Sequence, residues 1–84
     1  MIRIYADFND ANGEDEHWIL AYDGEPLEKR VEGLGLSVGD KVVLHQDEDD
    51  FEVIARLDFR YEPLAGRETW LAKPDWSTLA RKSD

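Results

Sequence analysis

The chain has 84 residues, no cysteine, and twenty acidic against ten basic residues, which give a formal net charge of −10. The absence of cysteine excludes disulfide scaffolds, zinc ribbons and thiol chemistry, and the negative charge disfavours nucleic acid and anionic membranes as partners. Domains cluster at roughly 100–150 residues, and no apolar run approaches the roughly 20 residues that span a bilayer. We therefore expect one cytoplasmic domain over residues 1–84, with its core closed by aromatic and aliphatic side chains.

The first half of the chain alternates apolar segments with turns. Apolar and polar residues alternate through residues 2–8, which predicts a first strand. Residues 9–16 gather acids and turn formers, and the aromatic and branched residues of 17–22 predict a second strand. From Pro26 apolar residues recur at helical spacing, and Gly33 is placed to end one or two helical turns.

The second half begins with a predicted hairpin. Residues 41–46 and 51–62 are its strands, and the acidic residues of 47–50 form its turn. In the second of these strands alternate residues share one apolar face, which we expect to be buried: Phe51, Val53, Ala55, Leu57, Phe59 and Tyr61.

The C-terminal segment predicts one more strand and a short helix. Residues 68–73 indicate a fifth strand. After Pro74, Asp75 is placed to cap a terminal helical turn that runs from Trp76 to Arg81 and Lys82. The pattern as a whole predicts a mainly β protein. We expect a small five-stranded, SH3-like curved barrel with one short helix between its second and third strands and a terminal helical turn.

A resemblance to known families covers residues 26–57. It consists of Leu34-Gly35-Leu36, then Gly39-Asp40-Lys41-Val42, an acidic turn and the strand that follows it. This stretch resembles the SH3-like barrels of Tudor and KOW type, and also the AbrB/MazE-like swapped-hairpin family of transcription factors and antitoxins. The whole chain is also similar to the small acidic proteins common in bacterial genomes, a likeness that implies no function.

The two resemblances imply different functions. The AbrB-like one implies a homodimer that grips DNA with basic residues of its N-terminal hairpin, although the matching loop here carries Asp10, Glu14, Asp15 and Glu16. The Tudor-like one implies an aromatic cage for methylated side chains. Residues of suitable type for such a cage are Trp18, Tyr22, Phe51, Trp70 and Trp76.

The residues themselves favour a non-enzymatic protein-interaction module, monomeric or homodimeric, that binds a basic protein or peptide. No spacing indicates a catalytic, cofactor or metal site, because the chain contains no nucleophile elbow, phosphate loop or complete calcium loop. Acidic surfaces steer basic partners and Trp is enriched at interaction hot spots, so the expected partner-binding residues are Asp47, Glu48, Asp49, Asp50, Trp70 and Trp76. The alternatives are an AbrB/MazE-like DNA-binding or antitoxin protein, and a small hydrolase or metal-dependent enzyme.

Overall fold

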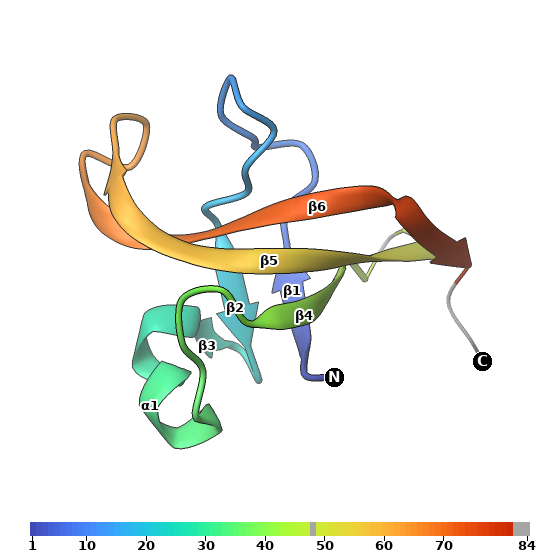
Figure 1. The fold of residues 1–84 in the computed structure, drawn as a ribbon, viewed down its shortest axis with the longest axis horizontal. Coiled ribbons are helices and arrows are strands. Elements are labelled where there is room, and N and C mark those ends of the chain that lie inside the picture. The colour runs from blue at the N-terminus through green and yellow to red at the C-terminus, as the bar shows by residue number, and fades with distance from the viewer. Residues whose placement is uncertain (48, 82–84) are drawn as a thin grey trace.

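The structure, a computed structural model, describes residues 1–47 and 49–81 and is mainly β (Figure 1). A single mixed sheet holds all the strands of this part of the chain. In chain order the elements are β1 (Arg3–Ala6), β2 (Leu20–Tyr22), β3 (Glu25–Pro26), the 3-10 helix η1 (Leu27–Lys29), α1 (Val31–Leu34), β4 (Lys41–His45), β5 (Phe51–Glu62) and β6 (Arg67–Arg81).

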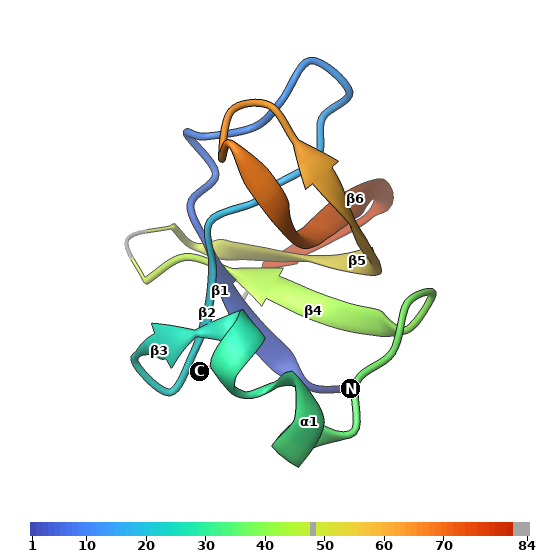
Figure 2. The ribbon, with the colours of Figure 1, turned by 90° about the vertical axis from the view of Figure 1, so that its left-hand side faces the viewer.

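The strands lie in the order β3-β2-β1-β4-β5-β6. β1 pairs antiparallel with β2, and β4, β5 and β6 form an antiparallel meander. β1 and β4, however, run parallel to each other. A parallel pair needs a crossover connection, and η1 and α1 lie within the segment that makes it. Figure 2 shows these helical turns beside β3, away from the long β5–β6 hairpin.

The helical segment confirms the prediction made from Pro26, with one change in how it ends. Proline fixes the backbone angle φ near the helical value and suits a helix start, and η1 begins directly after Pro26. Gly33, however, lies inside α1, and the left-handed residue that ends the helix is Gly35, with a φ of 68°. Gly35 takes this role because a residue without Cβ adopts positive φ at little cost.

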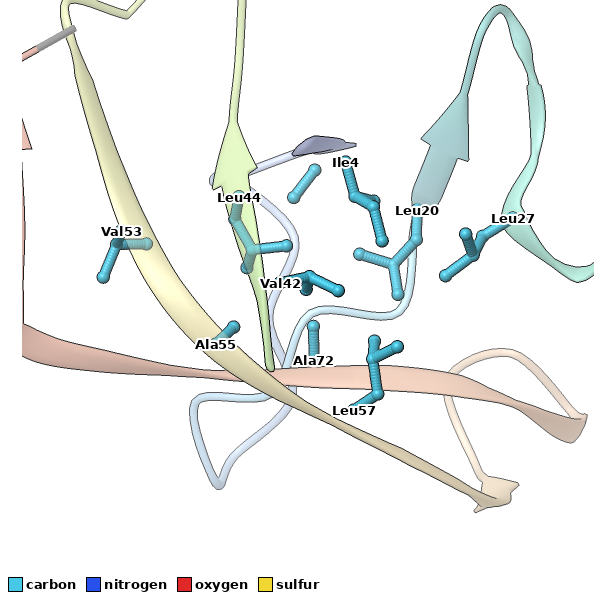
Figure 3. Packing of buried hydrophobic residues seen from close by; sticks show 10 residues of the cluster. Ile4, Leu20, Leu27, Val42, Leu44, Val53, Ala55, Leu57 and Ala72 are labelled. Carbon is cyan, nitrogen blue, oxygen red and sulfur yellow. The ribbon is translucent and has the colours of Figure 1, made fainter. Parts of the chain in front are cut away.

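The core lies on one face of the curved sheet (Figure 3). Its buried members come from β1, β2, β4, β5 and β6 and from the start of η1: Ile4, Ala6, Leu20, Leu27, Val42, Leu44, Val53, Ala55, Leu57 and Ala72. The predicted alternation of β5 is confirmed from Val53 to Leu57. It is wrong for the last two members, since Phe59 is 41% exposed and Tyr61 59% exposed. The β5–β6 hairpin extends beyond the core there, so those side chains meet solvent.

The sheet is not closed into the predicted barrel, and it has six strands instead of five because Glu25–Pro26 pairs with β2. One contact draws its two sides together. The backbones of His17 and Ala72 exchange two hydrogen bonds, with N···O distances of 2.8 and 2.9 Å. This isolated bridge joins the segment before β2 to the middle of β6, so the sheet curls without forming a continuous ladder.

The predicted terminal helical turn is wrong for residues 76–81, and Lys82 lies outside the described residues. β6 continues through Pro74 to Arg81, and Phe51 pairs with Arg81 at its far end. Pro74 is tolerated because β6 is the last strand of the sheet, and an edge strand can leave one side of its backbone unpaired. A register shift between Glu52 and Ile54 accommodates the residues after Pro74, and the Thr78 hydroxyl there accepts a hydrogen bond from the Ile54 N–H.

Candidate functional site

The parallel pairing of β1 and β4 brings two acidic segments to one end of the sheet. Because the two strands point the same way, the acidic loop after β1 and the acidic turn after β4 begin at the same edge. A hydrogen bond joins them: the Phe8 N–H donates to Oε1 of Gln46 over 2.8 Å. Two segments about 40 positions apart in the chain therefore share one surface.

Three aromatic rings pack together at this end. The ring centroids of Phe8 and Phe51 lie 5.0 Å apart, and Trp76 lies 6.2 Å from Phe8 and 6.4 Å from Phe51. The rings come from the turn after β1, the start of β5 and the second half of β6. Phe8 was not among the expected partner-binding residues. In the sequence, Phe8 ends a predicted strand of alternating apolar and polar residues, a pattern typical of a core residue. Its contacts with Phe51 and Trp76 follow from the pairing of β1 with β4, which the sequence did not indicate.

Trp76 is the exposed member of this cluster, with 43% of its surface accessible. Its indole N–H donates a hydrogen bond of 2.5 Å to the carboxylate of Asp15. Asp15 has a φ of 61°, a left-handed conformation that aspartate tolerates better than most residues. The strained loop thus presents a carboxylate beside the exposed indole.

The acidic turn between β4 and β5 lies in the same region. The side chains of Asp47 and Asp50 are 86% and 74% exposed. Asp47 lies 3.8 Å from Nδ1 of His45, and Asp50 lies 3.1 Å from Nε of Arg81. Exposed pairs of this kind contribute little to stability. Glu48 lies outside the described residues. We name the surface formed by Phe8, Asp15, Asp47, Asp49, Asp50, Phe51 and Trp76 the acidic–aromatic end.

Trp70 is not part of this surface. Its ring packs on Phe59, with centroids 5.4 Å apart, and against the core. Together with Leu27 and Glu28 it lines a small cavity of about 30 Å³. The two tryptophans expected to act together therefore lie in different surroundings, because the residues between them continue as an extended strand and do not fold back.

The aromatic cluster forms a platform and not a cage. A cage must hold its rings apart so that a cation fits between them, whereas Phe8, Phe51 and Trp76 contact one another directly. Among the other cage candidates, Tyr22 lies under the guanidinium of Arg30, 5.3 Å from ring centroid to Cζ. Trp76 is the most exposed of the three residues, so its side chain is the most accessible to a ligand.

A partly buried polar network holds the loop before β2 in place. Arg60 pairs with Glu16, which is buried, and this hydrogen bond raises the pKa of Arg60. Asn12 donates to both Glu16 and Glu62, over 3.0 and 2.8 Å. Hydrogen bonds from Asn12 and from the Leu64 N–H lower the pKa of Glu62. The loop that carries Asp15 is thus fixed to the β5–β6 hairpin at several points.

Within residues 1–47 and 49–81, no group of three or more His, Asp or Glu side chains is arranged to hold a metal ion. In the same ranges, no helix has the length and apolar character needed to cross a membrane.

Comparisons with models of protein families, with curated proteins and with solved structures found no match to this chain. The functional argument therefore rests on the geometry of the acidic–aromatic end.

Proposed function

We propose that this protein is a non-enzymatic interaction module that binds a basic peptide or a basic segment of another protein at the acidic–aromatic end. The observation that carries the proposal is the carboxylate of Asp15 against the exposed indole of Trp76, at the end of the sheet where the acidic turn begins. Asp15 lies directly against Trp76, and Asp47, Asp49 and Asp50 belong to the turn that leads into Phe51. Carboxylates and an aromatic face are the two groups that recognise a Lys or Arg side chain most directly.

The chemistry of this surface suits a cation with an apolar stem. An ammonium or guanidinium over the face of Trp contributes about 0.5–2 kcal/mol, depending on its desolvation. The methylene groups of Lys or Arg can also cover apolar ring surface while their charged ends reach the carboxylates. Trp76 therefore serves as the anchor of the proposed site, and the acidic turn selects the charge of the partner.

The net charge of −10 attracts a basic partner over a distance, before the two molecules touch. An excess of negative charge steers a basic partner toward the molecule and raises its association rate, an effect that salt screens. Screening lengths fall from about 30 Å at 0.01 M salt to about 8 Å at 0.15 M. Binding by this mechanism is consequently fastest at low salt.

The test uses a short peptide in which Arg alternates with Gly, titrated by calorimetry at low and at physiological salt. A first variant, Trp76→Leu, removes the platform. A second removes three charges from the acidic turn: Asp47→Asn, Asp49→Asn and Asp50→Asn. A matched control removes three charges near η1 and the hairpin tip: Glu28→Gln, Glu32→Gln and Glu68→Gln.

We expect the Trp76 and acidic-turn variants each to weaken binding by roughly tenfold, which corresponds to about 1.4 kcal/mol. The matched control should change the affinity by less than about twofold, because it alters the long-range field but not the site. Equal weakening by the acidic-turn variant and the matched control would mean that the peptide responds only to net charge, and the proposed site would then be wrong.

A further inference from the structure

The outer face of the sheet, opposite the core, carries a hollow of about 700 Å³ over β4, β5 and β6. Three basic residues line it: Lys41, Arg56 and Lys73. They are direct cross-strand neighbours, since Lys41 pairs with Arg56 and Arg56 pairs with Lys73. A row of three cations thus crosses three adjacent strands of a protein whose net charge is −10.

This row is unfavourable in the free protein. Like charges directly opposite each other in a sheet destabilise it. Within the described residues, none of these three cations forms an ion pair, with an N···O distance of 4.0 Å or less, to a carboxylate. The chain has twice as many acidic as basic residues. If the three cations served only to stabilise the fold, we would expect them to form ion pairs with some of these carboxylates.

The acids that line the same hollow already have partners. Glu16 and Asp58 pair with Arg60. Asp75 accepts hydrogen bonds from the backbone N–H and the hydroxyl of Ser77, over 3.1 and 2.6 Å. The pKa of Asp75 is lowered mainly by these hydrogen bonds, and the positive charge of Lys41 lowers it further. The hollow therefore holds as many carboxylates as cations, but none of its three cations forms an ion pair with them.

We propose that the hollow binds a small organic phosphate, with the phosphate group on Arg56 between Lys41 and Lys73. Neighbouring strands are about 4.8 Å apart, so the backbones of the three cations span about 10 Å. A guanidinium offers a planar fork that suits phosphate oxygens, and two ammonium groups beside it add point charges. Val38, Ile54 and Pro74 also line the hollow and supply apolar surface for the organic part.

The surroundings favour a small ligand over a long polyanion. The volume lies within the range of about 300–1,000 Å³ that is typical of small-molecule sites. A nucleic acid laid along the row would meet Glu16, Asp58 and Asp75 at once, and the net charge would repel its flanking phosphates.

The experiment follows backbone amide shifts by NMR while phenyl phosphate, inorganic phosphate and a hexaglutamate peptide are titrated separately at constant ionic strength. We expect phenyl phosphate to give saturable shifts centred on Lys41, Arg56 and Lys73, and to bind more tightly than inorganic phosphate. Arg56→Gln should weaken phenyl phosphate binding by about tenfold or more, since hydrogen bonds to charged groups are each worth about 1.5–3 kcal/mol. Arg67→Gln, which removes a charge paired with Glu28, should change it by less than about twofold.

Three results would overturn the proposal. These are no saturation by phenyl phosphate up to about 10 mM, equal weakening by the two Arg variants, or tighter binding of hexaglutamate than of phenyl phosphate at the same residues. The last would assign the hollow to an acidic peptide. The inference does not depend on the proposed function, because Arg56→Gln is expected to leave binding of the basic peptide at the acidic–aromatic end intact.

Discussion

The indole N–H of Trp76 donates a hydrogen bond to the carboxylate of Asp15, 61 positions away in the chain. The bond joins the loop before β2 to the second half of β6. It also fixes the orientation of an exposed Trp whose ring would otherwise be held only by its contacts with Phe8 and Phe51. Stability measurements can test the joint contribution of this bond and of the left-handed backbone of Asp15.

Asp15→Asn should cost less stability than Asp15→Ala. Asn keeps an oxygen acceptor and tolerates positive φ, whereas Ala loses the hydrogen bond and must also adopt a left-handed conformation. We expect a loss of about 1–2 kcal/mol for Ala and less than about 1 kcal/mol for Asn, measured by urea unfolding. Unchanged stability in both variants would show that Asp15 has neither role.

Leu57→Ala should remove much of the stability of this small domain. Leu57 is 1% exposed in the core, and buried Leu→Ala substitutions cost about 2–5 kcal/mol. The control is Leu79→Ala, at a β6 residue that is 52% exposed, where we expect a change within about 0.5 kcal/mol. Thermal and urea unfolding of both variants provide the measurement. A Leu57→Ala protein as stable as the control would mean that the core assigned to β5 is wrong.

Arg56→Gln should stabilise the protein in the absence of ligand. The substitution removes the middle charge of the row of Lys41, Arg56 and Lys73, and relief of cross-strand repulsion is worth about 0.2–1 kcal/mol. The gain should shrink at about 1 M NaCl, where the screening length is about 3 Å. Urea unfolding at both salt concentrations measures it. A loss of stability at low salt would contradict the repulsion inferred for this row.

Glu62→Gln should make stability less dependent on pH under acidic conditions. The folded-state pKa of Glu62 is lowered, chiefly by the hydrogen bond from Asn12. Its ionised form therefore stabilises the fold fully above the unfolded pKa of about 4.3, and that contribution is lost as the pH falls through the lower folded pKa. We expect the stability difference between wild type and Glu62→Gln to be largest above about pH 5 and to shrink toward pH 3.

Many acids titrate in the same range, so the Glu62 measurement needs a reference. Glu68→Gln removes an exposed glutamate at the start of β6, and we expect its stability difference from wild type to stay nearly constant between pH 5 and 3. If the two variants followed the same pH profile, the loss would reflect general charge repulsion and not the hydrogen bonds of Glu62.

The sequence by itself determined several local features. Alternation in residues 51–57 identified the buried face of β5, and Pro26 marked the start of the helical segment. These features depend only on residues within a few positions along the chain, because the spacing of apolar residues indicates which side chains lie on the same face. The acidic turn that joins β4 and β5 in a hairpin was identified in the same way.

Sequence patterns failed where distant segments decide the outcome. The apolar period of β5 gave no sign that Phe59 lies beyond the core. Pro74 and Asp75 resembled a helix start, yet pairing with β5 keeps that segment extended to Arg81. Tertiary context overrides such local preferences because a strand gains its hydrogen bonds from a partner elsewhere in the chain.

Only the tertiary structure decided which residues meet at the two proposed sites. The parallel pairing of β1 with β4 unites Phe8 with the acidic turn, and the registers of β4, β5 and β6 align Lys41, Arg56 and Lys73. A one-residue shift in the register of β4, β5 or β6 would move one of these three side chains to the opposite face of the sheet, and the three cations would no longer be neighbours. Register is defined by two paired strands, so it cannot be predicted from the sequence of one segment alone.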